Sequence, residues 1–318
     1  MKILFLGTGA ATPTRRRNVS ALAFLPEQRS EWWLFDCGEG TQHQVLRAPV
    51  TLPRLRRIFI THLHGDHVFG LPGLLASRAL QGAADPLDIY GPRGIQELLD
   101  AVRKACGLHL PYTLTIHEVS PGIVFEDDEF IVRAVAVVHG GQTHSHIIDE
   151  KPQAGRFRIE EAKALNIPPG PIYARLKRGE RVKLDDGREI DGATLVDPPR
   201  AGRKVVLMSD TCDGSAALPF AQDADIVVHE ATFLGSENEQ EAHERRHSTA
   251  ADAARFAVAA DARRLALTHI SARYEQEAGA GKTIADLAAE ARAVFSGETI
   301  MAQDFLTIDI PRRSSASM

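Results

Sequence analysis

The chain has 318 residues, of which 44% are hydrophobic and 25% charged, and its formal net charge is −5. This composition is typical of a globular protein with a large core, in one large domain or two ordinary ones. It offers no general attraction to nucleic acid, so any such binding must come from local basic patches. No apolar run approaches the roughly 18 residues of a membrane span, and three widely spaced cysteines suit a reducing compartment. We therefore expect a cytoplasmic protein that does not cross a membrane.

Strands and helices are predicted along most of the chain. Apolar, β-branched and aromatic runs predict strands, and apolar residues at helical spacing predict helices. Before residue 150, the predicted strands are 2–9, 21–25, 32–38, 55–60, 87–92, 113–120 and 130–140, and the predicted helices 41–48, 68–80 and 94–107. After residue 200, the predicted strands are 203–211, 224–233, 263–270 and 304–310, and the predicted helices 249–260 and 283–295. Capping boxes are expected at Thr41 with Gln44 and at Thr249 with Asp252.

The order of these elements indicates the fold class. The strands come partly in consecutive runs, so we expect an α/β protein with two mixed sheets packed together and helices outside. Residues from about 151 to 200 break the pattern, because they are rich in proline, glycine and charge. This segment is predicted to protrude as an arm inserted into a single domain.

A cluster of metal-ligand residue types follows the predicted strand 55–60. In "HLHGDH", His62 and His64 alternate and can point the same way, while Asp66 and His67 can face a second point in space. Neutral imidazole and carboxylate are nitrogen and oxygen ligands of zinc, and a position left open to water makes a site catalytic. Two adjacent ligand sets predict two metal ions.

Further ligands are expected at other strand ends, because two ions need more than four. Three polar residues directly follow apolar strands, which brings distant parts of the chain to one edge of a sheet: His139, Asp210 and His269. His144 and His146 compete with His139 as ligands, although His139 holds the strand-end position.

Several motifs together resemble ribonuclease Z of the metallo-β-lactamase superfamily. They are "FLGTGAATPTRRRN", "FDCGEGTQHQ", "HLHGDHVFGLPG", "NIPPGPIYARLKRGE", "HEATF", "RHST" and "THISARY". The resemblance implies an αββα sandwich and a zinc-dependent endoribonuclease. Its activity would be to cleave the 3′ trailer from precursor tRNA by attack of a metal-activated hydroxide, leaving a tRNA 3′-hydroxyl.

The resemblance also implies a role for each ligand. One zinc would be held by His62, His64 and His139 and the other by Asp66, His67 and His269, with Asp210 bridging both. Asp66 would also orient the nucleophile. The chain departs from the family pattern at Ser145 and His146, where a Gly-Tyr pair is usual, and at Ser209, where a glycine is usual. We expect local adjustment there rather than a lost metal.

Expulsion of an alkoxide from a phosphodiester requires a proton donor. His247 is the candidate, because it directly precedes a predicted helix start, and Glu230 in "HEAT" would orient the imidazole and hold its proton. Alternatively, His247 is an exposed residue before a helix and Glu230 belongs to a structural polar network. His229 is expected to lie in the core or behind the ligands.

Two basic segments are candidates for RNA contact. The resemblance implies that Arg15, Arg16 and Arg17 lie in a loop that touches the substrate, unless they form only a solvated loop. It also implies that the arm is an exosite for the folded tRNA; the basic residues of the arm are Arg175, Lys177, Arg178, Arg181 and Lys183. A homodimer follows from the resemblance alone. The alternative functions are a phosphodiesterase or thioester hydrolase for small substrates and an inactive RNA-binding relative.

Overall fold

The computed structural model describes residues 1–275 and 281–313. The chain divides into two compact units, described here one at a time. The larger unit contains Met1–Asp149 and Lys204–Pro311, and the smaller one contains Glu150–Arg203 and the segment from Arg312 onward.

The first sheet of the larger unit has seven strands, in the order β16-β1-β2-β3-β4-β5-β6. Its strands are β1 (Lys2–Gly7), β2 (Ala21–Leu25), β3 (Trp32–Phe35), β4 (Leu55–Phe59), β5 (Leu87–Gly91), β6 (Leu114–Glu118) and β16 (Thr307–Asp309). Strands β3 to β6 pair in parallel, whereas β1 pairs antiparallel with β2 and β16. The sheet is therefore mixed, as predicted.

The second sheet also has seven strands, in the order β15-β14-β13-β12-β9-β8-β7. Its strands are β7 (Gly122–Glu126), β8 (Phe130–Ala136), β9 (His144–Glu150), β12 (Lys204–Leu207), β13 (Ile226–Glu230), β14 (Arg264–Thr268) and β15 (Glu298–Met301). Strands β7, β9 and β15 were not predicted. In β9 the polar residues His144, Ser145 and His146 are all buried. The strand was missed because its sequence lacks the apolar run that predicts a buried strand.

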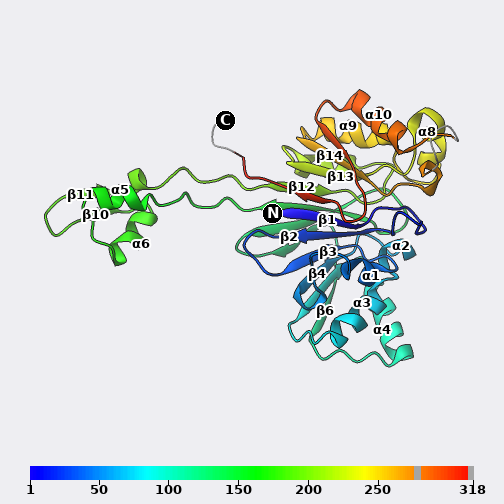
Figure 1. Ribbon diagram of the computed structural model, residues 1–318, viewed down its shortest axis with the longest axis horizontal. Helices are drawn as coiled ribbons and strands as arrows, with labels where there is room; N and C mark the ends of the chain where they lie inside the picture. Colours follow the sequence, from blue (N-terminus) through cyan, green and yellow to red (C-terminus); the bar gives the residue numbers. More distant parts are fainter. Residues whose placement is uncertain (276–280, 314–318) are drawn as a thin grey trace. The chain divides into compact units, whose positions relative to one another are not determined.

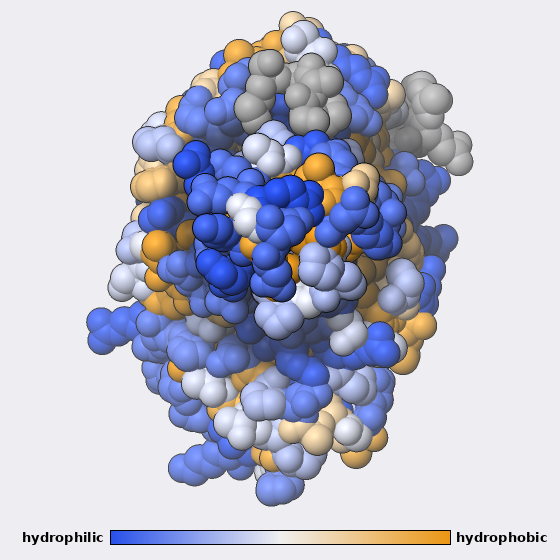
Figure 2. All heavy atoms as spheres, turned by 90° about the vertical axis from the view of Figure 1, so that its left-hand side faces the viewer, coloured by the Kyte–Doolittle hydropathy of each residue, from blue (hydrophilic) through white to orange (hydrophobic). Residues whose placement is uncertain are grey.

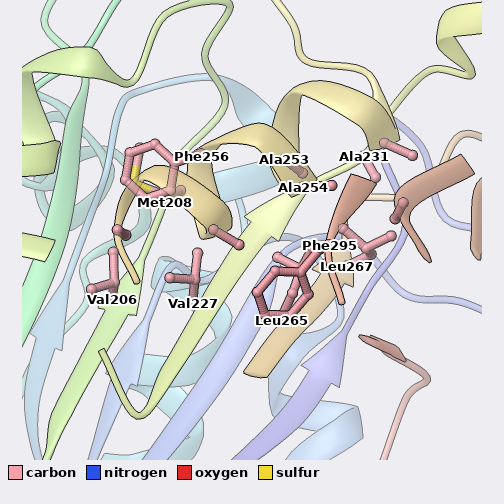
Figure 3. Packing of buried hydrophobic residues seen from close by; sticks show 14 of the residues in the cluster. Val206, Met208, Val227, Ala231, Ala253, Ala254, Phe256, Leu265, Leu267 and Phe295 are labelled. Atoms are coloured by element: carbon pink, nitrogen blue, oxygen red, sulfur yellow. The ribbon is translucent and has the colours of Figure 1, made fainter. Parts of the chain in front are cut away.

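Helices cover the outer faces of the two sheets in the larger unit (Figure 1). They are α1 (Thr41–Val45), α2 (Gly65–Val68), α3 (Leu71–Leu80), α4 (Ile95–Cys106), α7 (Leu218–Ala221), α8 (Gly235–Glu244), α9 (Ala250–Ala259) and α10 (Ile284–Val294). One apolar cluster joins inner residues of both sheets, such as Trp33 and Val205. A second joins residues of α9 and of the second sheet; in it Phe256 lies beside Met208, and Leu265 lies beside Phe295 (Figure 3). The predicted four-layer arrangement of helix, sheet, sheet and helix is confirmed.

One of the two predicted capping boxes is present. Thr249 accepts from the backbone N–H of Asp252, and the Asp252 carboxylate accepts from the backbone N–H of Thr249. The box predicted at Thr41 is wrong, because α1 begins after Gly40 in a left-handed conformation. Gln44, the expected partner, instead donates to the carbonyl oxygen of Leu6 at 2.7 Å. Its side chain is used to hold α1 against the first sheet.

The smaller unit has a core of its own. It contains α5 (Ile159–Ala164), α6 (Pro171–Lys177) and a hairpin of β10 (Arg181–Lys183) and β11 (Glu189–Asp191). Seven residues form the buried cluster: Phe157, Ala162, Ile167, Leu176, Val182, Leu184 and Leu195.

The ends of the smaller unit are joined by a buried pair of charges. Arg203 donates to Glu150 from Nε and Nη2, each at 2.8 Å.

Polar residues cover most of the face that Figure 2 draws, with apolar residues scattered among them. Among the described residues, no helix is both long and apolar enough to cross a membrane.

Candidate metal centre and active site

The candidate ligands follow the carboxyl ends of strands from both sheets. His62 and His64 follow β4, and the short helix α2 next to them carries Asp66 and His67. From the second sheet, His139 follows β8, Asp210 follows β12 and His269 follows β14. The structure brings together all seven side chains that the sequence predicted as ligands.

These side chains form three overlapping groups whose ligand atoms lie within 4.8 Å of one another. The groups are His62, His64 and His139; Asp66, His67 and His269; and His62, His67 and Asp210. Asp210 Oδ2 lies 3.3 Å from His67 Nε2 and 3.2 Å from His269 Nε2. It also lies 4.0 Å from Nε2 of both His62 and His139. One carboxylate therefore faces both ends of the cluster.

The donor set fits divalent metal ions. Nδ1 of His64 lies 3.0 Å from Nε2 of His62 and 3.2 Å from Nε2 of His139. Three imidazole nitrogens that converge in this way, beside the carboxylates of Asp66 and Asp210, present the nitrogen and oxygen ligands that zinc takes.

The far nitrogen of four of the histidines is held by another group. His62 Nδ1 lies 2.9 Å from Thr61 Oγ1, and His67 Nδ1 lies 2.8 Å from Asp36 Oδ2. His139 Nδ1 lies 2.8 Å from the Arg246 carbonyl oxygen, and His269 Nδ1 lies 2.8 Å from Thr232 Oγ1. Such contacts fix the tautomer and the orientation of a metal-binding imidazole. The sequence prediction assigned no role to Asp36, although this residue follows β3 directly and shows the same strand-end signal.

Burial and neighbouring charges set the protonation of the cluster. Burial and the adjacent imidazoles hold the pKa of His62 well below its usual value, and burial lowers the pKa of His139. Burial opposes ionisation of Asp210, but the charges of His269 and His67 outweigh it and hold the Asp210 pKa well below its usual range. Burial lowers the pKa of His67, but Asp210 and Asp36 outweigh it and hold that pKa well above its usual value. Because metal binds a neutral imidazole and an ionised carboxylate, a bound ion would displace the His67 proton.

His247 and Glu230 form a hydrogen-bonded pair beside the cluster. His247 Nδ1 lies 3.1 Å from each carboxylate oxygen of Glu230 and 4.0 Å from Asp210 Oδ2. Glu230 is buried and accepts from the backbone N–H of Thr211 at 2.6 Å. Burial lowers the pKa of His247, but the hydrogen bond and charge of Glu230 outweigh it and raise that pKa to about 9. The contact with Glu230 therefore favours the protonated imidazole.

His144, His146 and His229, which the sequence analysis also considered, lie outside these groups. His229 is buried, and its Nδ1 lies 2.8 Å from the Glu230 carbonyl oxygen. His144 and His146 lie in β9 and are buried, and neither belongs to a ligand group among the described residues. Of the three candidates considered for that position, only His139 lies in the cluster.

The departures from the family pattern lie next to one another in space. Ser145 Oγ accepts from the backbone N–H of Ser209 at 3.0 Å. His146 packs edge-on against Phe35 and Phe59, and burial lowers its pKa to about 3. Asp210 keeps its place in the ligand cluster beside these substitutions.

The residues predicted to contact RNA differ in their environments. Arg15 and Arg16 lie in a bend and are exposed, but Arg17 is buried. Arg17 Nη1 donates to Thr8 Oγ1 at 2.7 Å and to the Ala302 carbonyl oxygen at 2.6 Å, and Arg17 Nε lies 3.2 Å from Glu275. The expectation of a phosphate contact by Arg17 therefore does not fit its position, because its guanidinium is used to hold the fold together.

The predicted basic residues of the smaller unit also differ in whether they form ion pairs. Arg175 and Arg178 both pair with Glu180, at 2.9 and 2.7 Å, and Arg181 pairs with Asp191. Lys177 and Lys183 have no ion-pair partner within the described ranges. These two lysines are the freest cations of the set.

Comparisons with known proteins agree with this geometry. The metallo-β-lactamase-fold protein YhfI from Bacillus subtilis superposes with a TM-score of 0.67 at 18% identity, over 96% of this chain and 98% of that one. Human tRNase Z, short form, superposes with a TM-score of 0.70 at 29% identity, over 98% of this chain and 100% of that one. Residues 1–136 match the family model described as Anti-Pycsar protein Apyc1. The chain thus has the metallo-β-lactamase fold, with a His/Asp cluster at the strand ends.

Full-length relatives define the family. A ribonuclease Z from Synechococcus sp. (strain WH7803) is 50% identical over 322 residues, covering 100% of this chain and 98% of that one. A ribonuclease Z from Nostoc sp. (strain PCC 7120 / SAG 25.82 / UTEX 2576) is 50% identical over 317 residues, covering 98% and 96%. The chain belongs to the ribonuclease Z family.

Proposed function

We propose that this protein is a metal-dependent endoribonuclease that removes the 3′ trailer of precursor tRNA and leaves a tRNA 3′-hydroxyl. The observation that carries the proposal is the convergence of seven ligand side chains beside the His247–Glu230 pair. Membership of the ribonuclease Z family supports the choice of substrate. Hydrolysis adds water across the phosphodiester, so the 5′-phosphate stays on the trailer.

The ligands would hold two zinc ions in each subunit. His62, His64 and His139 would hold one ion and Asp66, His67 and His269 the other, with Asp210 between them. Bound ions of this kind supply a water that ionises near neutral pH, together with positive charge for the attacked phosphate.

Asp66 would orient the attacking water. Its Oδ2 accepts from the backbone N–H of Ala11 at 2.9 Å and lies 3.4 Å from His269 Nε2. These contacts fix one carboxylate oxygen, and ionisation is favoured because His269 and His67 outweigh burial and hold the Asp66 pKa below its usual value.

His247 would donate the proton to the departing 3′-oxygen. Glu230 holds Nδ1, so Nε2 is the nitrogen left to face the substrate. With a pKa raised to about 9, the imidazole carries its proton at neutral pH. A positioned acid of this kind matters most for a poor leaving group such as a ribose alkoxide.

Basic side chains of both units would bind the RNA. Arg15 and Arg16 of the larger unit are candidates near the cut, and Lys177 and Lys183 of the smaller unit are candidates for the folded tRNA body. We take residues 151–200 as the inserted arm of a single domain. A homodimer that acts in the cytoplasm completes the proposal.

Cleavage of a 5′-labelled precursor tRNA with a 3′ trailer tests the function. A single metal-dependent product that ends at the acceptor stem, absent with His64→Ala or a chelator, is expected. Failure to cleave the precursor, with hydrolysis of a small aryl phosphodiester retained, would favour the alternative of a small-substrate phosphodiesterase.

A further inference from the structure

The larger unit has a cavity of about 1050 Å³ next to the ligand cluster. Leu63 and His64 line it on one side, and Gly140 and Gln142 follow His139. Gln96, Asp100 and Lys104 line it along α4, from the first turn to the last. His64 is exposed, and both it and Gly140 adjoin the ligands, so the cavity continues directly from the metal centre. We call it the α4 cavity.

Some of the charged side chains that line the α4 cavity have hydrogen-bond partners, and others have none. Glu118 accepts from the backbone N–H of Gly94 at 2.7 Å, and Asp100 accepts from Gln96 Nε2 at 2.7 Å. The side chains of Arg93 and Lys104 have no partner within the described ranges. Among the acids of the lining, Glu97 likewise has no partner there. Asp100 also lies 3.9 Å from Arg103 Nη1, whereas Glu97 and Glu118 have no charged partner within the described ranges, so the lining offers two cations, Arg93 and Lys104, beside two carboxylates.

The volume limits what can enter. Pockets of roughly 300–1,000 Å³ hold drug-sized molecules, so the α4 cavity has room for a few unpaired nucleotides. Its lining suits them, because Leu63 and Ala101 offer apolar surface to bases and the amide of Gln142 offers hydrogen bonds to base edges.

We propose that the α4 cavity binds the first nucleotides of the single-stranded 3′ trailer, with Arg93 and Lys104 contacting their phosphates. The inference rests on the proposed function, which identifies the trailer as the unpaired strand beyond the cut. His247 groups with Glu230 and His269, residues that do not line the α4 cavity. The acid thus serves the departing tRNA 3′-oxygen, while the trailer, which keeps the phosphate, continues past His64.

The test compares precursors with trailers of one and six nucleotides, using Arg93→Ala/Lys104→Ala. We expect KM for the six-nucleotide precursor to rise roughly tenfold, and the slope of log KM against log salt to fall by about two. The one-nucleotide precursor and bis(p-nitrophenyl) phosphate should change less than about twofold. Lys2→Ala/Arg54→Ala is the matched control, because it removes two exposed cations that do not line the α4 cavity.

An equal loss with the matched control, or an equal loss for both trailer lengths, would overturn the proposal. A measurement on the unaltered protein avoids dependence on folding of the variant. Hydrolysis of bis(p-nitrophenyl) phosphate should be inhibited more strongly by a 5′-phosphorylated RNA hexamer than by a 5′-phosphorylated mononucleotide, and equal inhibition would contradict a trailer site. If the unaltered protein cleaves no precursor but still hydrolyses the ester, the proposed function fails, a result distinct from failure of the trailer site.

Discussion

Glu230 holds the imidazole of His247 at Nδ1, with both carboxylate oxygens 3.1 Å away. Because Glu230 is buried and also accepts from the backbone N–H of Thr211, it cannot turn away to another partner at low cost. The pair therefore fixes one tautomer and keeps a proton on His247.

Glu230→Gln tests whether this proton is used. Without the charge of Glu230, burial lowers the pKa of His247 from its raised value of about 9. The protonated imidazole is then lost at a lower pH than in the unaltered protein. We expect kcat for precursor tRNA to fall by roughly 10²–10⁴ at pH 8, and the alkaline limb of the pH profile to move to lower pH. Hydrolysis of bis(p-nitrophenyl) phosphate should change little, because p-nitrophenolate leaves without a proton. Equal loss on both substrates would argue for a purely structural role.

Asp36→Asn tests the support behind a ligand. Asp36 accepts from His67 at 2.8 Å, and loss of such a contact typically weakens metal affinity by about 10- to 100-fold. Zinc affinity, measured by competition with a chelating dye, should fall within that range. Asp88→Asn is the matched control, because Asp88 pairs with His117 at 3.0 Å outside the cluster. Equal affinities in the two variants would show that Asp36 does not support the metal.

The sequence predicted the ligand cluster more fully than the elements around it. His139, Asp210 and His269 could be predicted because each is a polar residue directly after an apolar strand, a signal that needs no knowledge of contacts. Strand β9 could not be predicted in that way, since its polar residues are buried by pairing with β12 and by the rings of Phe35 and Phe59. Arg17 and Gln44 were misinterpreted for a related reason, because their partners lie far away in the sequence at Ala302 and Leu6.

His146→Phe tests the cost of one of these buried polar groups. Neither ring nitrogen of His146 has a hydrogen-bond partner among the described residues, and the ring lies on a cavity of about 60 Å³ between the sheets. An unsatisfied buried polar group costs about 1–3 kcal/mol, so phenylalanine should raise the free energy of unfolding, measured in urea. Unchanged or lower stability would indicate that buried water satisfies the histidine.

Asp252→Asn tests the capping box of α9. Burial opposes ionisation of Asp252, but contacts with Thr249 outweigh it and lower the Asp252 pKa to about 2. A carboxylate with a lowered pKa stabilises the fold above its unfolded pKa, and this stabilisation is lost as pH falls from about 4 towards 2. We expect the variant to lose about 1 kcal/mol at pH 7, and the difference to shrink at pH 3. A difference that does not depend on pH would contradict a contribution from the ionised form.

Lys177→Ala/Lys183→Ala tests RNA binding by the smaller unit. Both lysines have no ion-pair partner among the described residues, so their removal should leave the fold intact. We expect KM for precursor tRNA to rise several-fold and its log–log salt slope to fall by about two, with bis(p-nitrophenyl) phosphate hydrolysis unchanged. Lys163→Ala/Arg188→Ala is the control, because these cations of the same unit already pair with Glu160 and Asp186. An equal rise in KM in both variants would mean that the net charge of the unit, rather than the two free lysines, attracts the RNA.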